Sequence, residues 1–188
     1  ALIEAARAAH TLAAAGRFGL QAVRPVVDYA AVMAHVSRTI AAIAPMDSQE
    51  RFEGLGVRVI RGWGRFTGPD RLEAAGQQIR ARRFVIATGS RPALPPLPGL
   101  DETPYLTNET LFSLRTAPAH LLVLGGGPIG VEIAQAHLRL GVPVTLVESG
   151  RVLGREDPEL AAQITATLRA EGATVLDQTA VSRVEPAG

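Results

Sequence analysis

Glycine occupies positions Gly125, Gly127 and Gly130, directly after the apolar run Leu121–Leu124. This G-x-G-x-x-G spacing is common by itself, but here an apolar strand pattern precedes it and an amphipathic helix pattern follows it. The first glycine allows a tight turn, the second lets the backbone approach a phosphate, and the third lets the helix pack close to the sheet. The spacing therefore predicts a loop that holds the pyrophosphate of a dinucleotide.

The start of the predicted helix would face the same ligand. Pro128 suits the first helical turn, because proline has no N–H group to leave without a partner. The free N–H groups of that turn and the partial positive charge of the helix start attract an anion. We expect the pyrophosphate to contact Gly125, Gly126, Gly127, Pro128, Ile129 and Gly130.

An acidic residue, Glu148, ends the next apolar strand pattern, Val144–Val147, about 20 residues after the loop. Its carboxylate would accept hydrogen bonds from the adenosine ribose and repel a 2′-phosphate, so the sequence predicts NAD(H) in preference to NADP(H). Arg151 and Arg155 leave NADP(H) open as the alternative cofactor, since either could neutralise a 2′-phosphate if the loop bends back. The alternative for the whole pattern is a glycine turn that only joins strand to helix, with Glu148 as a solvated strand end.

An alternation of strands and helices from residue 121 onward must position these residues. The expected strands are 121–124, 143–148, 173–177 and a last one near 179–185, and the expected helices are 128–140 and 158–171. Asp157, directly before Pro158, is expected to cap the second of these helices.

The first part of the chain predicts helices. Residues 1–15 are rich in alanine, and Gly16 is placed to end that helix in a left-handed conformation. Asp28 is expected to cap a second helix that runs to about residue 44, where Pro45 stops it. A short helical stretch is expected before Gly54.

Strands are expected after these helices. The alternation that begins at Val57 predicts an antiparallel meander, and the apolar run Phe84–Ala87 predicts a strand buried on both faces. Four prolines within residues 92–98 predict a stiff, extended domain crossing. Asn108 is expected to cap a short helix through Leu114.

Composition excludes several classes of function. The 188 residues carry a net charge of +1 with scattered basic residues, which argues against a nucleic-acid surface. The chain has no cysteine, so it holds no disulfide, thiolate metal site or cysteine nucleophile, and its four histidines lack ligand spacing. Without an apolar run of membrane-spanning length, we expect no membrane contact and a cytoplasmic protein.

The sequence resembles the FAD-dependent pyridine nucleotide–disulfide oxidoreductases, nearest to the lipoamide dehydrogenase and mercuric reductase branch. The resemblance rests on LLVLGGGPIGVEIA at 121–134, VTLVE at 144–148 and RFVIATGSRP at 83–92. REDPEL at 155–160 and ALIEAARA at 1–8 extend it over essentially the whole chain. In that family NAD(P)H passes hydride to a flavin, and the flavin reduces a disulfide.

The resemblance implies further site residues. Glu132 matches the acid of the family's GGGxIGxE pattern near the nicotinamide–flavin junction, with a first-turn helix acid favoured by the helix dipole as the alternative. Thr88, Gly89 and Ser90 match a segment that lies against FAD. Gly64 matches a backbone contact to the adenosine half of FAD, with a strand bulge as the alternative.

Several family features lie outside these 188 residues: the first glycine motif for FAD, a cysteine pair expected just before Ala1, a later FAD segment, and the dimerisation domain with its His–Glu pair. We therefore expect a fragment, inactive alone, of a homodimeric α/β protein. Residues 1–116 would be part of an FAD-binding domain with an antiparallel β-meander. Residues 117–188 would be the N-terminal half of a Rossmann-like NAD(P)-binding domain with a parallel sheet.

Two other functions stay open at this point. One is a flavoprotein of the same shape without a dithiol, such as a soluble transhydrogenase or an NADH oxidase. The other is a module that senses NAD(H) without catalysis. A cysteine pair four residues apart upstream of Ala1 would favour the disulfide reductase, and flavin bound to the product of the full gene would exclude the sensor.

Overall fold

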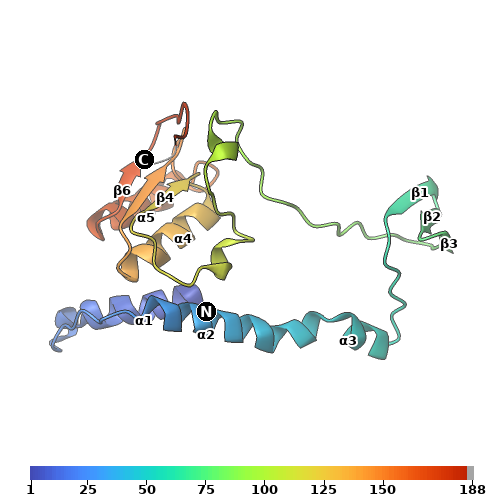
Figure 1. Cartoon of the computed structure of the whole chain (residues 1–188), viewed down its shortest axis with the longest axis horizontal. Coiled ribbons are helices and arrows are strands. Elements are labelled where there is room, and N and C mark those ends of the chain that lie inside the picture. Colours follow the sequence, from blue (N-terminus) through green and yellow to red (C-terminus); the bar gives the residue numbers. More distant parts are fainter. Residues whose placement is uncertain (186–188) are drawn as a thin grey trace. The chain divides into compact units, whose positions relative to one another are not determined.

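The structure is a computed structural model that describes residues 1–185 (Figure 1). The chain divides into two compact units: one contains Ala1–Thr39 and Ala93–Gly188, and the other contains Ile40–Pro92. The expected boundary between an FAD-binding domain and an NAD(P)-binding domain, at residues 116 and 117, stays a prediction.

A three-stranded parallel sheet forms the centre of the first unit (Figure 1). Its strands follow the order β4-β5-β6, with the bounds Leu121–Leu124, Val144–Val147 and Thr174–Leu176. Two helices make the crossovers, α4 (Pro128–Arg139) and α5 (Pro158–Ala170). Parallel neighbours need such crossovers, because a tight turn joins only antiparallel strands. The predicted alternation of strands and helices is confirmed over residues 121–176.

The start of α5 is capped as expected. Oδ1 of Asp157 accepts hydrogen bonds from the N–H groups of Glu159 at 2.9 Å and Leu160 at 3.2 Å, and Pro158 occupies the first turn. These bonds satisfy two of the donors that a helix start leaves without intrahelical partners.

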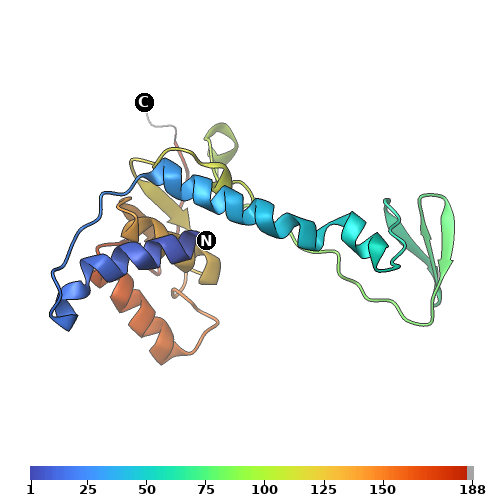
Figure 2. The ribbon, with the colours of Figure 1, turned by 90° about the horizontal axis from the view of Figure 1, so that it is seen from below.

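Two apolar clusters hold this unit together. One lies among β5, α5 and the loop after β5, and its most buried members are Leu146, Leu168 and Val152. The other joins α4 to two N-terminal helices, α1 (Leu2–Ala13) and α2 (Tyr29–Ile43). There α1 packs along α4 (Figure 2). The sheet and the N-terminal helices are therefore parts of one packed body.

The ends of the N-terminal helices correct one prediction and confirm another. After Ala13 the chain tightens into the 3₁₀ helix η1 (Ala15–Phe18), so the left-handed residue is Gly19, with φ +75°, and not Gly16. The tighter turn delays the reversal by three residues. Oδ1 of Asp28 accepts the N–H of Ala31 at 3.0 Å and caps α2 as expected.

The second unit contains the short helix and the meander that were predicted. The chain continues past Pro45 in the 3₁₀ helix η2 (Ala44–Asp47), and α3 follows (Gln49–Gly54). The meander has the antiparallel order β1-β2-β3, with the bounds Gly64–Gly68, Arg71–Ala74 and Gln77–Arg80. Ala75 and Gly76 both take positive φ, as a two-residue hairpin turn requires. The predicted α/β fold class, with one antiparallel and one parallel sheet, is confirmed.

Three strand predictions and one helix prediction are wrong. The segments 57–59, 84–87 and 179–185 are irregular, and Val85 is 91% exposed instead of buried. A strand needs a hydrogen-bonded neighbour, and no described strand pairs with these segments. Residues 107–114 form a turn and the 3₁₀ helix η4 (Leu111–Ser113), opened by the side chain of Thr107 and not by Asn108.

None of the helices within residues 1–185 has the length and apolar character needed to cross a membrane.

Candidate dinucleotide site

The glycine loop between β4 and α4 has the backbone geometry that its residues permit. Gly125 takes φ +106°, a left-handed conformation, and its N–H donates to the carbonyl of Val147 at 2.9 Å. At Gly130 a Cβ would lie 2.0 Å from the carbonyl oxygen of Gly125. The first glycine therefore makes the turn, and the third lets α4 start against it.

The start of α4 presents unpaired donors. Gly127 is the N-cap, without a side-chain cap, and its carbonyl accepts the N–H of Val131 at 3.0 Å. The N–H groups of Gly127, Ile129 and Gly130 precede the first intrahelical bond and have no acceptor within residues 1–185. A Cβ added at Gly127 would meet no atom within 4 Å, so the space on the Cβ side of this residue is open.

Glu148 lies directly against the loop. Its Oε2 accepts the N–H of Gly126 at 2.7 Å, and its Oε1 accepts the N–H of Gly150 at 2.8 Å and the hydroxyl of Ser149 at 3.2 Å. The bonds from Gly150 and then Gly126 lower the pKa of the Glu148 carboxyl, so it is charged at neutral pH. Three of about four acceptor positions on the carboxylate are used, which leaves room on Oε2 for a ligand hydroxyl.

The loop after β5 holds Gly126 from the other side. The N–H of Leu153 donates to the Gly126 carbonyl at 2.8 Å, and Leu153 takes φ +53° with its side chain buried. Both peptide groups of Gly126 are thus fixed, one by Glu148 and one by Leu153. Leu153 was not among the predicted site residues, and the only sequence signal for it is the apolar pair Val152-Leu153 within a polar loop.

The two arginines of this loop differ in their surroundings. Nη2 of Arg151 donates to the carbonyls of Gly154 and Glu156, each at 3.1 Å, so this guanidinium is bound within the loop. Arg155 is exposed and has no hydrogen-bond partner within the described residues.

Glu132 lies on α4 beyond the first turn, with its side chain exposed. The helix-dipole interpretation of this residue is therefore weaker than the sequence suggested, because the dipole effect falls off within one turn. Its place near a nicotinamide–flavin junction stays a prediction.

The residues expected to contact FAD belong to the second compact unit. Thr88, Gly89 and Ser90 are exposed and irregular, and Gly89 takes φ +72°. Gly64 begins β1, where a Cβ would lie 3.3 Å from Cδ2 of Leu72. This contact gives Gly64 a packing reason of its own, and the FAD contacts of all four residues stay predictions.

Comparison with known proteins places these features in a family. The family model "Pyridine nucleotide-disulphide oxidoreductase" matches residues 3–188. The chain is 37% identical to a mercuric reductase of Streptomyces lividans over 194 residues, which cover 100% of this chain and 41% of that protein. It is 40% identical to a mercuric reductase of Bacillus cereus over 134 residues, or 71% of this chain and 21% of that one.

Two solved structures are similar over the whole chain. LpdA from Mycobacterium tuberculosis aligns with a TM-score of 0.79 and 27% identity, covering 42% of that chain. The Cu(II) complex of the HOCl-induced flavoprotein disulfide reductase RclA from Escherichia coli aligns with a TM-score of 0.77 and 25% identity, covering 40% of that chain. The present chain thus spans about two fifths of these relatives.

Proposed function

The chain belongs to the pyridine nucleotide-disulphide oxidoreductase family, and we propose that it supplies the NAD(H)-binding loop of a flavoprotein enzyme that passes hydride from NAD(P)H to FAD and on to a disulfide or related acceptor. FAD is the cofactor of this family, and the similar proteins include mercuric reductases and a flavoprotein disulfide reductase. The reaction of the whole protein is part of the proposal, since the chain spans about two fifths of these relatives.

The observation that supports nucleotide binding is the set of unpaired N–H groups beside open space at Gly127. Each hydrogen bond from such a donor to a charged phosphate contributes about 1.5–3 kcal/mol, whereas the helix dipole contributes about 0.3–1 kcal/mol per charge. The directed N–H groups therefore matter more than the field of the helix. Their orientation depends on Gly126, which Glu148 and Leu153 hold in place.

The charge of Glu148 supports NAD(H) over NADP(H). An ionised carboxylate accepts a ribose hydroxyl but repels a phosphate at the same position, and its lowered pKa keeps it ionised. Arg151 is bound to carbonyls of its own loop, which leaves Arg155 as the residue that could neutralise a 2′-phosphate.

The remaining roles complete the proposal. Gly64, Thr88, Gly89 and Ser90 would contact FAD, which when bound accepts hydride from the nicotinamide, and Glu132 would lie near their junction. The partners are small-molecule dinucleotides, with no nucleic acid or membrane. A homodimeric assembly and a cytoplasmic location of the complete protein belong to the same proposal.

Titration of the 188-residue chain with NADH tests the nucleotide site. Gly127→Ala adds a Cβ into open space at an ordinary φ of −73°, so it should leave the fold intact and obstruct the pyrophosphate. We expect NADH affinity to fall about tenfold or more, the equivalent of about one lost hydrogen bond. Gly54→Ala, which also adds a Cβ into open space, is the matched control and should bind like the wild type. Unchanged binding by Gly127→Ala, or no NADH binding by the folded wild-type chain, would refute the proposal.

A further inference from the structure

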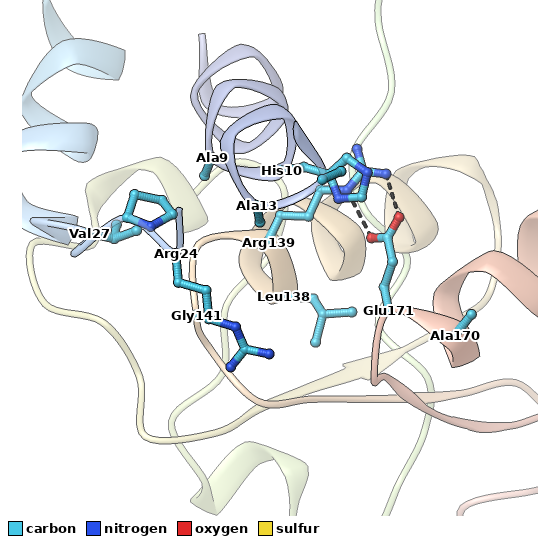
Figure 3. A pocket seen from close by; sticks show the side chains of 12 residues that line it. Ala9, His10, Ala13, Arg24, Val27, Leu138, Arg139, Gly141, Ala170 and Glu171 are labelled. Carbon is cyan, nitrogen blue, oxygen red and sulfur yellow. Dashed lines mark hydrogen bonds and ion pairs between the residues drawn. The ribbon is translucent and has the colours of Figure 1, made fainter. Parts of the chain in front are cut away.

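A cavity of about 490 Å³ lies at the opposite end of α4 from the glycine loop (Figure 3). Its walls come from the last turns of α1, α4 and α5 and from residues 24–27, which lead into α2. The twelve residues of α4 rise about 18 Å, so this cavity is separate from the dinucleotide site. Its volume is in the range of small-molecule sites.

Not every charged side chain that lines the cavity has a partner of opposite charge. Arg139 donates from Nε to Oε2 of Glu171 at 2.8 Å, and Gln135 donates to the same carboxylate, so this pair is neutral and its oxygens are occupied. The side chains of Arg24, which is exposed, and of His10 have no hydrogen-bond partner within residues 1–185. Figure 3 shows the Arg24 side chain apart from the Arg139–Glu171 pair. The unmatched charge of the cavity is therefore the guanidinium of Arg24.

The helix ends around the cavity do not cancel this positive charge. Helix C-termini carry partial negative charge because their last carbonyls lack intrahelical donors. Here the carbonyls of His10, Leu12, Leu138 and Leu168 already accept N–H groups from the residues that follow each helix, at 2.9–3.1 Å. A guanidinium bears a full charge and five donors, so Arg24 dominates recognition.

The rest of the lining is apolar and small. Ala9, Ala13, Val27 and Leu138 supply methyl and methylene surface. We propose that this cavity is a second ligand site, which binds a small organic monoanion: its carboxylate pairs with Arg24, and its apolar body lies against Ala13 and Leu138. A guanidinium binds a carboxylate through two parallel hydrogen bonds, which favours a carboxylate over an uncharged amide of the same shape.

Calorimetric titration of the chain with benzoate and with benzamide tests this site. We expect benzoate to bind with one-to-one stoichiometry and benzamide to bind about tenfold more weakly or not at all. Butyrate serves as a second carboxylate with an aliphatic body. Failure of both carboxylates to bind, or equal binding of benzoate and benzamide, would overturn the proposal.

Three variants locate the binding. Arg24→Gln removes the charge, and Ala13→Leu fills the cavity from an exposed position on α1, so each should weaken benzoate binding about tenfold. Arg38→Gln removes an exposed arginine of α2 that is not part of the lining, and it should bind benzoate like the wild type. NADH titration of the same variants is an independent measurement that should be unaffected. If benzoate binding is equal in all three variants, it is nonspecific and the cavity is not a ligand site.

Discussion

Tyr29 and His137 form a buried hydrogen bond between α2 and α4, with the Tyr29 hydroxyl 3.0 Å from Nε2 of His137. Nδ1 of the same ring lies 2.9 Å from the carbonyl oxygen of Ile133, which can only accept, so the proton is assigned to Nδ1. Nε2 therefore accepts from Tyr29, and the ring is neutral. The His137 side chain is fully buried, so both ring nitrogens depend on these partners.

Removal of the Tyr29 hydroxyl should destabilise the first unit. In Tyr29→Phe the acceptor Nε2 of His137 stays buried without a donor, which costs about 1–3 kcal/mol of unfolding free energy. Urea unfolding followed by circular dichroism measures the change. Tyr105→Phe alters an exposed tyrosine and is the control, with an expected change of less than about 0.5 kcal/mol. Equal stability of the two variants would contradict the structural role of this bond.

The stability of the chain should fall as the pH drops below neutral. Burial lowers the pKa of His137 in the folded state below its ordinary value, so the unfolded state takes up the proton first. The contribution is complete above the unfolded pKa of about 6.5 and is lost as the pH falls through and below it, by up to about 1.4 kcal/mol per pH unit. Glu148 acts at a lower pH. Its lowered pKa stabilises the folded state, and this contribution is lost only at the acidic pH where an unfolded carboxyl takes up a proton.

Urea unfolding between about pH 7 and pH 5 separates the two groups. His137→Gln should lose the slope in this interval, and His35→Gln, a change at an exposed histidine, should keep it. A wild-type chain with equal stability at both ends of the interval would show that His137 does not couple folding to protonation.

Substitution by alanine should lower the stability of the chain at Gly130 but not at Gly127. A Cβ at Gly130 would overlap the Gly125 carbonyl at 2.0 Å, so Gly130→Ala must displace the loop from α4 and should cost about 1–3 kcal/mol of unfolding free energy. Gly127→Ala has free space and should change stability by less than about 1 kcal/mol. Thermal unfolding of the two variants compares them directly. Similar losses in both would mean that the third glycine does not determine the packing of loop and helix.

Glu148→Gln should narrow the preference between the two nicotinamide cofactors. The amide removes the charge that repels a 2′-phosphate. Its NH₂ group faces either Gly126 or Gly150, so one of these two N–H groups loses its acceptor. We expect NADH affinity to fall about tenfold and NADPH affinity to change less. Calorimetric titration with both nucleotides measures the ratio. Glu156→Gln changes an exposed acid of the same loop and should leave the ratio of the two affinities unchanged. An unchanged ratio in Glu148→Gln would show that this carboxylate does not determine the selectivity.

The elements around the glycine loop followed from local chemistry. The spacing of Gly125, Gly127 and Gly130, the apolar strand before them and the Asp157–Pro158 pair each involve residues near one another in sequence. Turn conformation, helix capping and the 3.6-residue period are local properties, so the elements within residues 121–176 were predicted to within one residue at each end.

The wrong strand predictions depended on distant partners. Phe84–Ala87 has the composition of a buried strand, but a strand forms only where another strand offers hydrogen bonds, and no described strand lies beside it. The left-handed residue is Gly19 and not Gly16 for a local reason, since the 3₁₀ turn between them is not encoded by a single residue.

The sequence by itself determined the glycine loop, the acid at the strand end and the alternation that places them, because these features arise within short stretches of chain. Only the tertiary structure decided that Glu148 and Leu153 hold Gly126, that Tyr29 bonds His137 across 108 residues, and that Arg24 lines the cavity at the far end of α4. Each of these contacts joins groups whose distance in space is set by the packing of helices and loops on the sheet, which no local pattern specifies.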